Sequence, residues 1–78
     1  MWQVYILKCS DKTYYTSGTS NLKQRLFRHN KGQVHSTKDK LPLELITYTA
    51  FQDKYKAFDF EKYLKSGSGR AFRNKRML

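Results

Sequence analysis

One acidic residue of this sequence has the spacing from apolar residues that places it on the apolar side of a helix. Glu61 lies three or four residues from its apolar neighbours, and residues so spaced share one face of a helix. These neighbours are Ala57, Phe58 and Leu64. Withdrawing a carboxylate from water is costly unless a cation or hydrogen-bond donors compensate. Glu61 therefore predicts a partner, either a basic side chain in a structural ion pair or a metal ion facing a cleft, and the spacing favours neither.

A second candidate is a basic residue four positions from an imidazole. Arg25 and His29 project from the same face of a predicted helix. An arginine fork beside a titratable imidazole can hold a scissile phosphate and assist proton transfer. A basic helix face that contacts phosphate without chemistry is the alternative.

The six tyrosines include two on neighbouring predicted strands. Tyr5 and Tyr15 could present their phenols at one place, whereas Tyr14 points to the opposite face from Tyr15. Half-buried packing and stacking on unpaired bases are the alternatives. A nucleophilic Cys9 has no supporting context, and a small buried residue at a strand end is the favoured interpretation.

The charge of the chain points to a polyanionic partner. Sixteen Lys and Arg oppose six Asp and Glu in 78 residues, a formal charge of +10. Such a field attracts nucleic acid above other partners. With 38% hydrophobic residues the chain is not a disordered basic tail, and its single cysteine excludes a disulfide framework. We expect a cytoplasmic protein with no membrane span, folded as one domain over residues 1–78.

The elements that must position these residues form an α+β pattern. The predicted strands cover 2–9, 14–16 and 43–51, and the predicted helices 22–30, 54–65 and 69–75. Asp53 and Ser68 are the predicted caps of the last two helices. The order strand, strand, helix, strand, helix, helix predicts a small three-stranded sheet, an antiparallel hairpin plus a third strand, flanked by helices.

Four segments in this order resemble the GIY-YIG endonuclease superfamily. The likeness is strongest to its small standalone bacterial members, whose domain is of the excinuclease-C N-terminal type known from DNA repair. The segments are residues 2–7, 14–17, 21–30 and 61–72. Together they extend over nearly the whole chain, so the resemblance concerns the domain and not one motif.

The resemblance assigns roles to five residues. Tyr5 matches the tyrosine of the family's first motif and Tyr15 that of the second. Arg25 matches the helix arginine, and His29 a histidine found in many members. Glu61 matches the metal-binding glutamate.

The motif glycines are replaced in this chain. Gln3 stands for the first, and Ser17 for the second, with Gly18 directly after it. If the second glycine serves close backbone approach or a positive φ, Ser17 alters the site unless Gly18 takes over by a shift of one residue.

The activity that the resemblance implies is metal-dependent hydrolysis of phosphodiester bonds in nucleic acid, with DNA as the expected substrate. One Mg²⁺ or Mn²⁺ ion would be held by Glu61 and water, because a lone carboxylate with retained waters suits Mg²⁺. Tyr5, relayed by His29, would be the general base, Arg25 would bind the phosphate and Tyr15 would position the reactants.

Other basic residues are expected to hold the nucleic-acid backbone: Lys23, Arg28, Lys31, Arg70 and Arg73. The alternative function is a nucleic-acid-binding module on a nuclease fold without catalysis. A protein-interaction module is the third possibility.

Overall fold

Three strands form one antiparallel sheet in the order β2-β1-β3. β1 covers Trp2–Lys8, β2 Tyr14–Thr19 and β3 Glu44–Phe51. The computed structural model describes all of residues 1–78 and confirms the predicted α+β fold. β2 is therefore an edge strand, and the third strand, whose place the sequence left open, pairs with the other side of β1.

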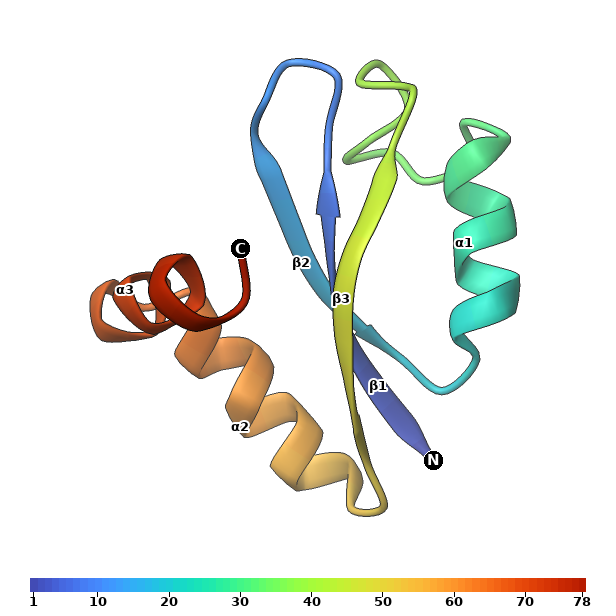
Figure 1. The fold of residues 1–78 in the computed structure, drawn as a ribbon. Helices are drawn as coiled ribbons and strands as arrows, with labels where there is room; N and C mark the ends of the chain where they lie inside the picture. Colours follow the sequence, from blue (N-terminus) through green and yellow to red (C-terminus); the bar gives the residue numbers. More distant parts are fainter.

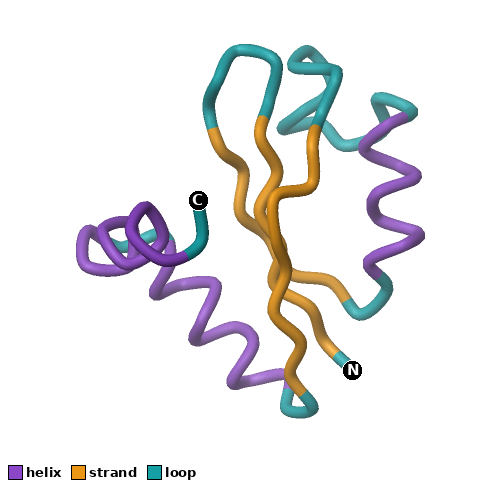
Figure 2. The backbone as a smooth tube through the Cα atoms, in the orientation of Figure 1, coloured by secondary structure: helices purple, strands orange, loops and turns teal.

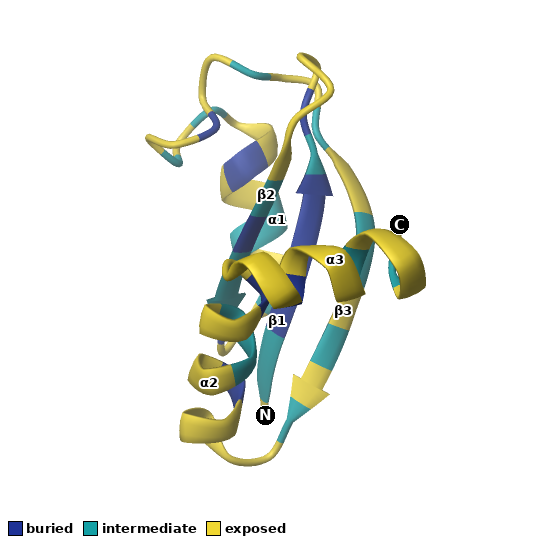
Figure 3. Ribbon diagram, turned by 90° about the vertical axis from the view of Figure 1, so that its left-hand side faces the viewer, coloured by how far each residue is buried: buried dark blue, intermediate teal, exposed yellow.

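The three helices cover both faces of this sheet (Figure 1). α1, Leu22–Asn30, lies on one face, and α2, Lys54–Leu64, lies on the other together with α3, Gly67–Arg76. The view in Figure 3 places α2 and α3 in front of the strands and α1 behind them. None of these helices combines the length and apolar character needed to span a bilayer.

β1 is buried because helices cover both of its faces. Its residues Val4, Tyr5, Ile6 and Leu7 are at most 1% exposed. Successive side chains of a strand point to opposite faces, so the strand serves two different surroundings. Val4 and Ile6 meet Ala57 and Leu64 of the α2 side in the apolar core, whereas Tyr5 faces α1.

β2 is longer than predicted. The sequence indicated an end at Thr16, but the strand continues to Thr19, and Ser17 and Gly18 pair with Tyr5 and Val4 of β1. Ser and Gly are typical turn residues, and here cross-strand pairing overrides that local preference.

The predicted cap of α3 was wrong, while that of α2 is confirmed. The Ser66 hydroxyl, not that of Ser68, accepts a hydrogen bond from the Gly69 backbone N–H. The helix thus begins two residues earlier than predicted, at Gly67. A side chain at Gly69 would overlap the Tyr63 carbonyl, so this glycine permits the tight passage from α2 to α3.

The apolar stripe of α2 is also shifted relative to the prediction. Ala57 and Leu64 are buried as expected, but Phe58 is 43% exposed and packs edge-on against Trp2. Phe60 packs against the core in its place. Position 58 is turned by about 100° from position 57 on a helix, which moves its side chain to the margin of the stripe.

Candidate active site

A buried hydrogen-bonded chain joins β1, α1 and the loop that follows α1. Tyr5 Oη lies 2.8 Å from His29 Nε2, and His29 Nδ1 lies 2.8 Å from Thr37 Oγ1. Tyr5, His29 and Thr37 are each no more than 1% exposed. His29 is the one buried residue of α1, so this helix is anchored to the sheet through an imidazole and not through an apolar side chain.

Tyr15 completes an aromatic cluster around His29. Its ring centroid lies 5.4 Å from that of His29 and 6.4 Å from that of Tyr5. Tyr15 comes from β2, two residues before Ser17, the partner of Tyr5 in the sheet. The alternation of β2 therefore directs Tyr15 and Ser17 to the face covered by α1. The structure thus brings together Tyr5, Tyr15 and His29, three of the predicted site residues.

Arg25 acts on the same cluster through its charge. Burial raises the pKa of the Tyr5 phenol above its usual range, while the Ser17 hydroxyl and the Arg25 guanidinium partly oppose that rise. Burial also lowers the pKa of His29, and the cations Arg25 and Arg28 lower it further. At neutral pH the site therefore contains a protonated phenol and a neutral imidazole.

Glu61 lies on the other side of the sheet. A Cβ atom added at Gly18 would stand only 2.9 Å from Glu61 Oε1, so this oxygen rests against the backbone of β2. Its other oxygen, Oε2, accepts a hydrogen bond of 2.8 Å from Nζ of Lys65, the residue that directly follows α2. Of the two partners that the sequence allowed, the basic side chain is present.

The edge strand β2 separates Glu61 from the tyrosine–histidine cluster. Ser17 faces Tyr5 on one side of the strand, and Gly18 faces Glu61 on the other. Neither residue has a positive φ. Close approach of the carboxylate therefore requires the absence of a side chain at Gly18 and not at Ser17, which is the shift of one residue that the sequence left open.

A basic hollow lies between β2 and the helices α2 and α3. It has a volume of about 290 Å³. Its cationic walls are Lys65, Arg70 and Arg73, and its other lining residues include Tyr15 and Tyr14. The Arg73 guanidinium lies 5.3 Å from the centre of the Tyr14 ring. Tyr15 thus borders both this hollow and the cluster around His29.

The remaining predicted contact residues lie on or next to α1. Lys23, Arg28 and Lys31 are exposed there, on the face of the sheet opposite to α3. The predicted nucleic-acid contacts therefore divide between two surfaces. Cys9 is buried and unpaired, as expected of a small residue at a strand end.

Glu61 is the predicted metal ligand, and its surroundings fit a largely hydrated ion. No group of three or more His, Cys, Asp or Glu side chains is placed to hold a metal. Mg²⁺ usually keeps several waters and is bound by one or two carboxylates, so a single ligand is compatible with it. Gly18 leaves the Glu61 carboxylate against open backbone, and the side chain keeps 24% of its exposure.

Comparison with known proteins identifies the family of this chain. The family model described as the GIY-YIG catalytic domain matches residues 1–76. This chain belongs to the GIY-YIG family. The geometry above is therefore that of a protein with a nuclease fold.

Several relatives carry the name UPF0213. One from Streptococcus pyogenes serotype M5 is 39% identical over 69 residues, which cover 87% of this chain and 75% of the relative. One from Pediococcus acidilactici is 39% identical over 67 residues, or 82% and 68% of the two chains. The solution NMR structure of a UPF0213 protein from Bacillus halodurans aligns with a TM-score of 0.61 at 31% identity, over 96% of this chain and 82% of that one.

Sequence reasoning missed Thr37, Lys65 and Tyr14 as members of these sites. The spacing of Lys65, four residues after Glu61, is the usual signal of a helical ion pair and could have identified it. Thr37 lies in a polar loop without periodicity, and no local pattern marks it as buried.

Proposed function

We propose that this protein is a metal-dependent endonuclease that hydrolyses phosphodiester bonds, with DNA as its substrate. The observation that carries the proposal is the buried hydrogen bond between Tyr5 Oη and His29 Nε2, beside the Arg25 cation. A phenol paired with a neutral imidazole is a general base with a proton acceptor behind it.

The proton transfers follow from the protonation states of these two groups. Tyr5 passes its proton to His29 Nε2 and becomes a tyrosinate. The tyrosinate takes a proton from the attacking water as the water oxygen bonds to phosphorus and the bond to the leaving oxygen breaks. Arg25 stabilises both the tyrosinate and the charge that develops on the phosphoryl oxygens. Tyr15 positions the water or the phosphate.

Glu61, with retained waters, would hold one Mg²⁺ or Mn²⁺ ion. When bound, the ion supplies charge stabilisation at the leaving oxygen and the phosphoryl group. The Lys65 ammonium now pairs with Glu61, but this exposed pair is worth only about 0.3–0.5 kcal/mol and is readily displaced. We place the scissile phosphate at the free edge of β2, because Tyr15 and Lys65 border the same hollow there.

The nucleic-acid backbone would be held by cations on both sides of that edge. Arg70 and Arg73 line the hollow, and Lys23, Arg28 and Lys31 extend the basic surface over α1. Phosphate contacts of this kind give salt-sensitive binding without sequence readout. A cytoplasmic location stays a prediction of the sequence.

Cleavage assays with plasmid and branched DNA test the activity. Incubation with Mg²⁺ or Mn²⁺ should give products, and EDTA should abolish them. Tyr5→Phe removes the phenolic oxygen that carries the proton, and we expect a loss of about 10²- to 10⁴-fold in rate. The matched control is Tyr55→Phe at a 71% exposed position, which should cleave normally. Wild-type rates in Tyr5→Phe would remove Tyr5 from the mechanism.

A second assay isolates the metal ligand. Glu61→Gln should lose metal-dependent cleavage, whereas Glu44→Gln, at an exposed position of β3, should keep it. If no substrate is cut by the wild type under any metal condition, the enzyme proposal is wrong.

The ion pair between Glu61 and Lys65 favours one other candidate function. A Glu61 carboxylate that is paired with Lys65, four residues further along the chain, is compatible with a nucleic-acid-binding module without turnover. That function predicts salt-dependent binding which survives Glu61→Gln, in a protein that never cleaves. Failure to bind any nucleic acid at low salt would instead favour a protein-interaction module.

A further inference from the structure

The second nitrogen of His29 has a single partner, the hydroxyl of Thr37. The distance from Nδ1 to Oγ1 is 2.8 Å, and Thr37 is 1% exposed although its loop is mostly polar and exposed. A buried hydroxyl that contacts an imidazole can determine which ring nitrogen carries the proton.

The backbone around Thr37 is held in place by the loop and by the turn between β1 and β2. The Thr37 N–H donates to the Val34 carbonyl, and the Lys40 N–H donates to the Thr37 carbonyl. The Ser10 N–H in turn donates to the Lys40 carbonyl at 3.0 Å. Figure 2 shows this loop returning beside the turn between β1 and β2.

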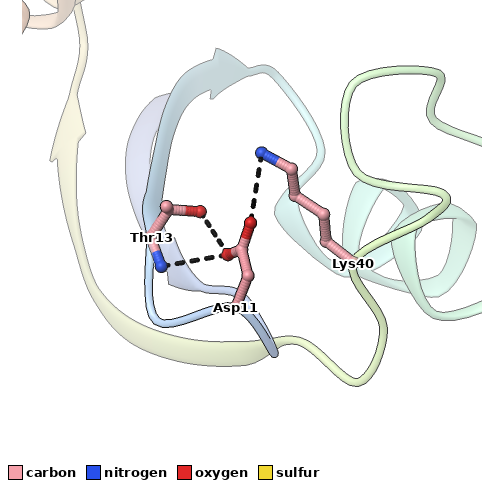
Figure 4. Close-up of polar contacts among 3 residues, drawn as sticks. All are labelled: Asp11, Thr13 and Lys40. Atoms are coloured by element: carbon pink, nitrogen blue, oxygen red, sulfur yellow. Dashed lines mark hydrogen bonds and ion pairs between the residues drawn. The ribbon is translucent and has the colours of Figure 1, made fainter.

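Side chains join the same two segments. Lys40 Nζ lies 3.7 Å from Asp11 Oδ2, and the other carboxylate oxygen of Asp11 accepts hydrogen bonds from the Thr13 backbone and hydroxyl (Figure 4). The position of the Thr37 hydroxyl is therefore set by residues of two loops and is not free to follow the imidazole.

The two hydrogen bonds of His29 identify which ring nitrogen carries its proton. Tyr5 Oη is hydrogen-bonded to His29 Nε2, and the Arg25 guanidinium, which can only donate, approaches the same phenol oxygen. We therefore assign the phenol as the donor to Nε2, which requires a lone pair on that nitrogen. A neutral imidazole with its lone pair on Nε2 carries its proton on Nδ1. The Nδ1–H group then donates to Thr37 Oγ1.

We propose that Thr37 is a positioning residue that holds His29 in the Nδ1–H tautomer, with Nε2 directed at the Tyr5 hydroxyl and able to accept its proton. The catalytic consequence rests on the proposed nuclease function. The tautomer itself does not, and it can be measured without any substrate.

NMR of the imidazole nitrogens tests the tautomer directly. Two-dimensional ¹H–¹⁵N spectra of the ¹⁵N-labelled wild type should show a protonated Nδ1 and an unprotonated Nε2 for His29. Exposed His35 provides the second signal, and His35→Gln assigns the two. A protonated Nε2 in the wild type would overturn the proposal.

Two substitutions of Thr37 separate its hydroxyl from its volume. Thr37→Val keeps the shape but would leave Nδ1–H buried without an acceptor, so we expect His29 to leave the Nδ1–H tautomer. Thr37→Ser keeps the hydroxyl and should retain the wild-type pattern. An unchanged pattern in a folded Thr37→Val protein would refute the assignment. If that variant does not fold, the wild-type spectrum still decides the tautomer, and Thr37→Ala, which also lacks the hydroxyl, tests the role of Thr37.

Kinetics supply the second readout. Thr37→Val should lower kcat by about 10- to 100-fold with little change in KM, as is typical of groups that orient a reacting residue, and Thr37→Ser should restore it. Equal kcat in wild type and Thr37→Val would exclude the positioning role. A wild type that shows the Nδ1–H tautomer but never cleaves would instead contradict the nuclease proposal alone.

Discussion

The two faces of the sheet have different kinds of interior. On the α2 face, Val4 and Ile6 of β1 pack against Ala57 and Leu64 in an apolar core. On the α1 face, the neighbouring Tyr5 of the same strand is hydrogen-bonded to His29, a polar residue buried among aromatic rings. One face thus contributes chiefly hydrophobic burial, and the other holds groups that can transfer a proton.

This division predicts that substitutions on the two faces have different consequences. On the α2 face they should reduce stability, because each removes apolar contacts. On the α1 face they should reduce activity first, because a buried hydrogen bond contributes only about 1 kcal/mol to stability. Glu61 lies at the margin of the apolar face, so substitutions there should affect both stability and activity.

The largest effect is expected in the apolar core. Leu64→Ala leaves a cavity under α2 and should lower the free energy of unfolding by about 2–5 kcal/mol. Urea denaturation followed by circular dichroism measures it. Leu78→Ala removes the same side chain at a 42% exposed position and should change stability far less. Equal losses in the two variants would show that the α2 face is not the main source of stability.

The margin between the faces is tested at Gly18. Gly18→Ala brings a methyl group 2.9 Å from Glu61 Oε1, so the carboxylate must move. We expect metal-dependent cleavage to fall by about 10- to 100-fold, the usual effect of displacing a ligand's support.

Gly67→Ala is the matched control for this substitution. Its Cβ atom would have no neighbour within 4 Å, and the variant should cleave like the wild type. If Gly18→Ala is as active as Gly67→Ala, the position of the Glu61 carboxylate against β2 does not matter for function.

The polar face should make stability depend on pH. Burial and neighbouring cations lower the pKa of His29 below 6.5. As the pH falls below 6.5, the imidazole therefore binds a proton more readily in the unfolded chain than in the folded one. The contribution of His29 to the free energy of unfolding is therefore fully present above about pH 6.5, and it is lost as the pH decreases towards the lower pKa of the folded state.

Unfolding measured between about pH 7.5 and 5 would show this slope. His29→Gln should flatten it, whereas His35→Gln, at an exposed position, should not. The raised pKa of Tyr5 acts at the other end of the range, where stability should decrease above about pH 10 as the unfolded phenol ionises first. A slope that persists in His29→Gln would assign the effect to another group.

The smallest change in stability is expected at Lys65. Lys65→Gln removes an exposed ion pair and should cost about 0.3–0.5 kcal/mol.

If Lys65 competes with the metal for Glu61, the variant should reach full cleavage at a lower Mg²⁺ concentration than the wild type. Lys62→Gln, on an exposed position of the same helix, is the control. A higher Mg²⁺ requirement in Lys65→Gln would mean that Lys65 assists the ion and does not compete with it.

Several features of the site followed from local patterns. The strand character of β1 and the helical spacing of α1 placed Tyr5, Arg25 and His29 on elements that do meet. The stripe of α2 indicated that Glu61 is partly withdrawn from water and needs a partner, and the structure pairs it with Lys65. Such results depend on the periods of helices and strands, which short segments already contain.

Other features could not be obtained in that way. The sequence alone did not show that Glu61 and Tyr5 lie on opposite faces, because that depends on which face of the sheet each helix covers. Nor could it show that Ser66 and not Ser68 caps α3, since two serines with the same capping chemistry lie within three residues.

The sequence by itself determined the number, kind and order of the elements, the excess of positive charge and the residue types available for chemistry. These are properties of neighbours along the chain. The tertiary structure decided that β1 is the central strand with β2 and β3 at the edges, that Gly18 and not Ser17 meets the Glu61 carboxylate, and that Thr37 contacts His29. Each of these depends on contacts between different elements or loops, and it exists only after the sheet has paired and the loops have packed on it.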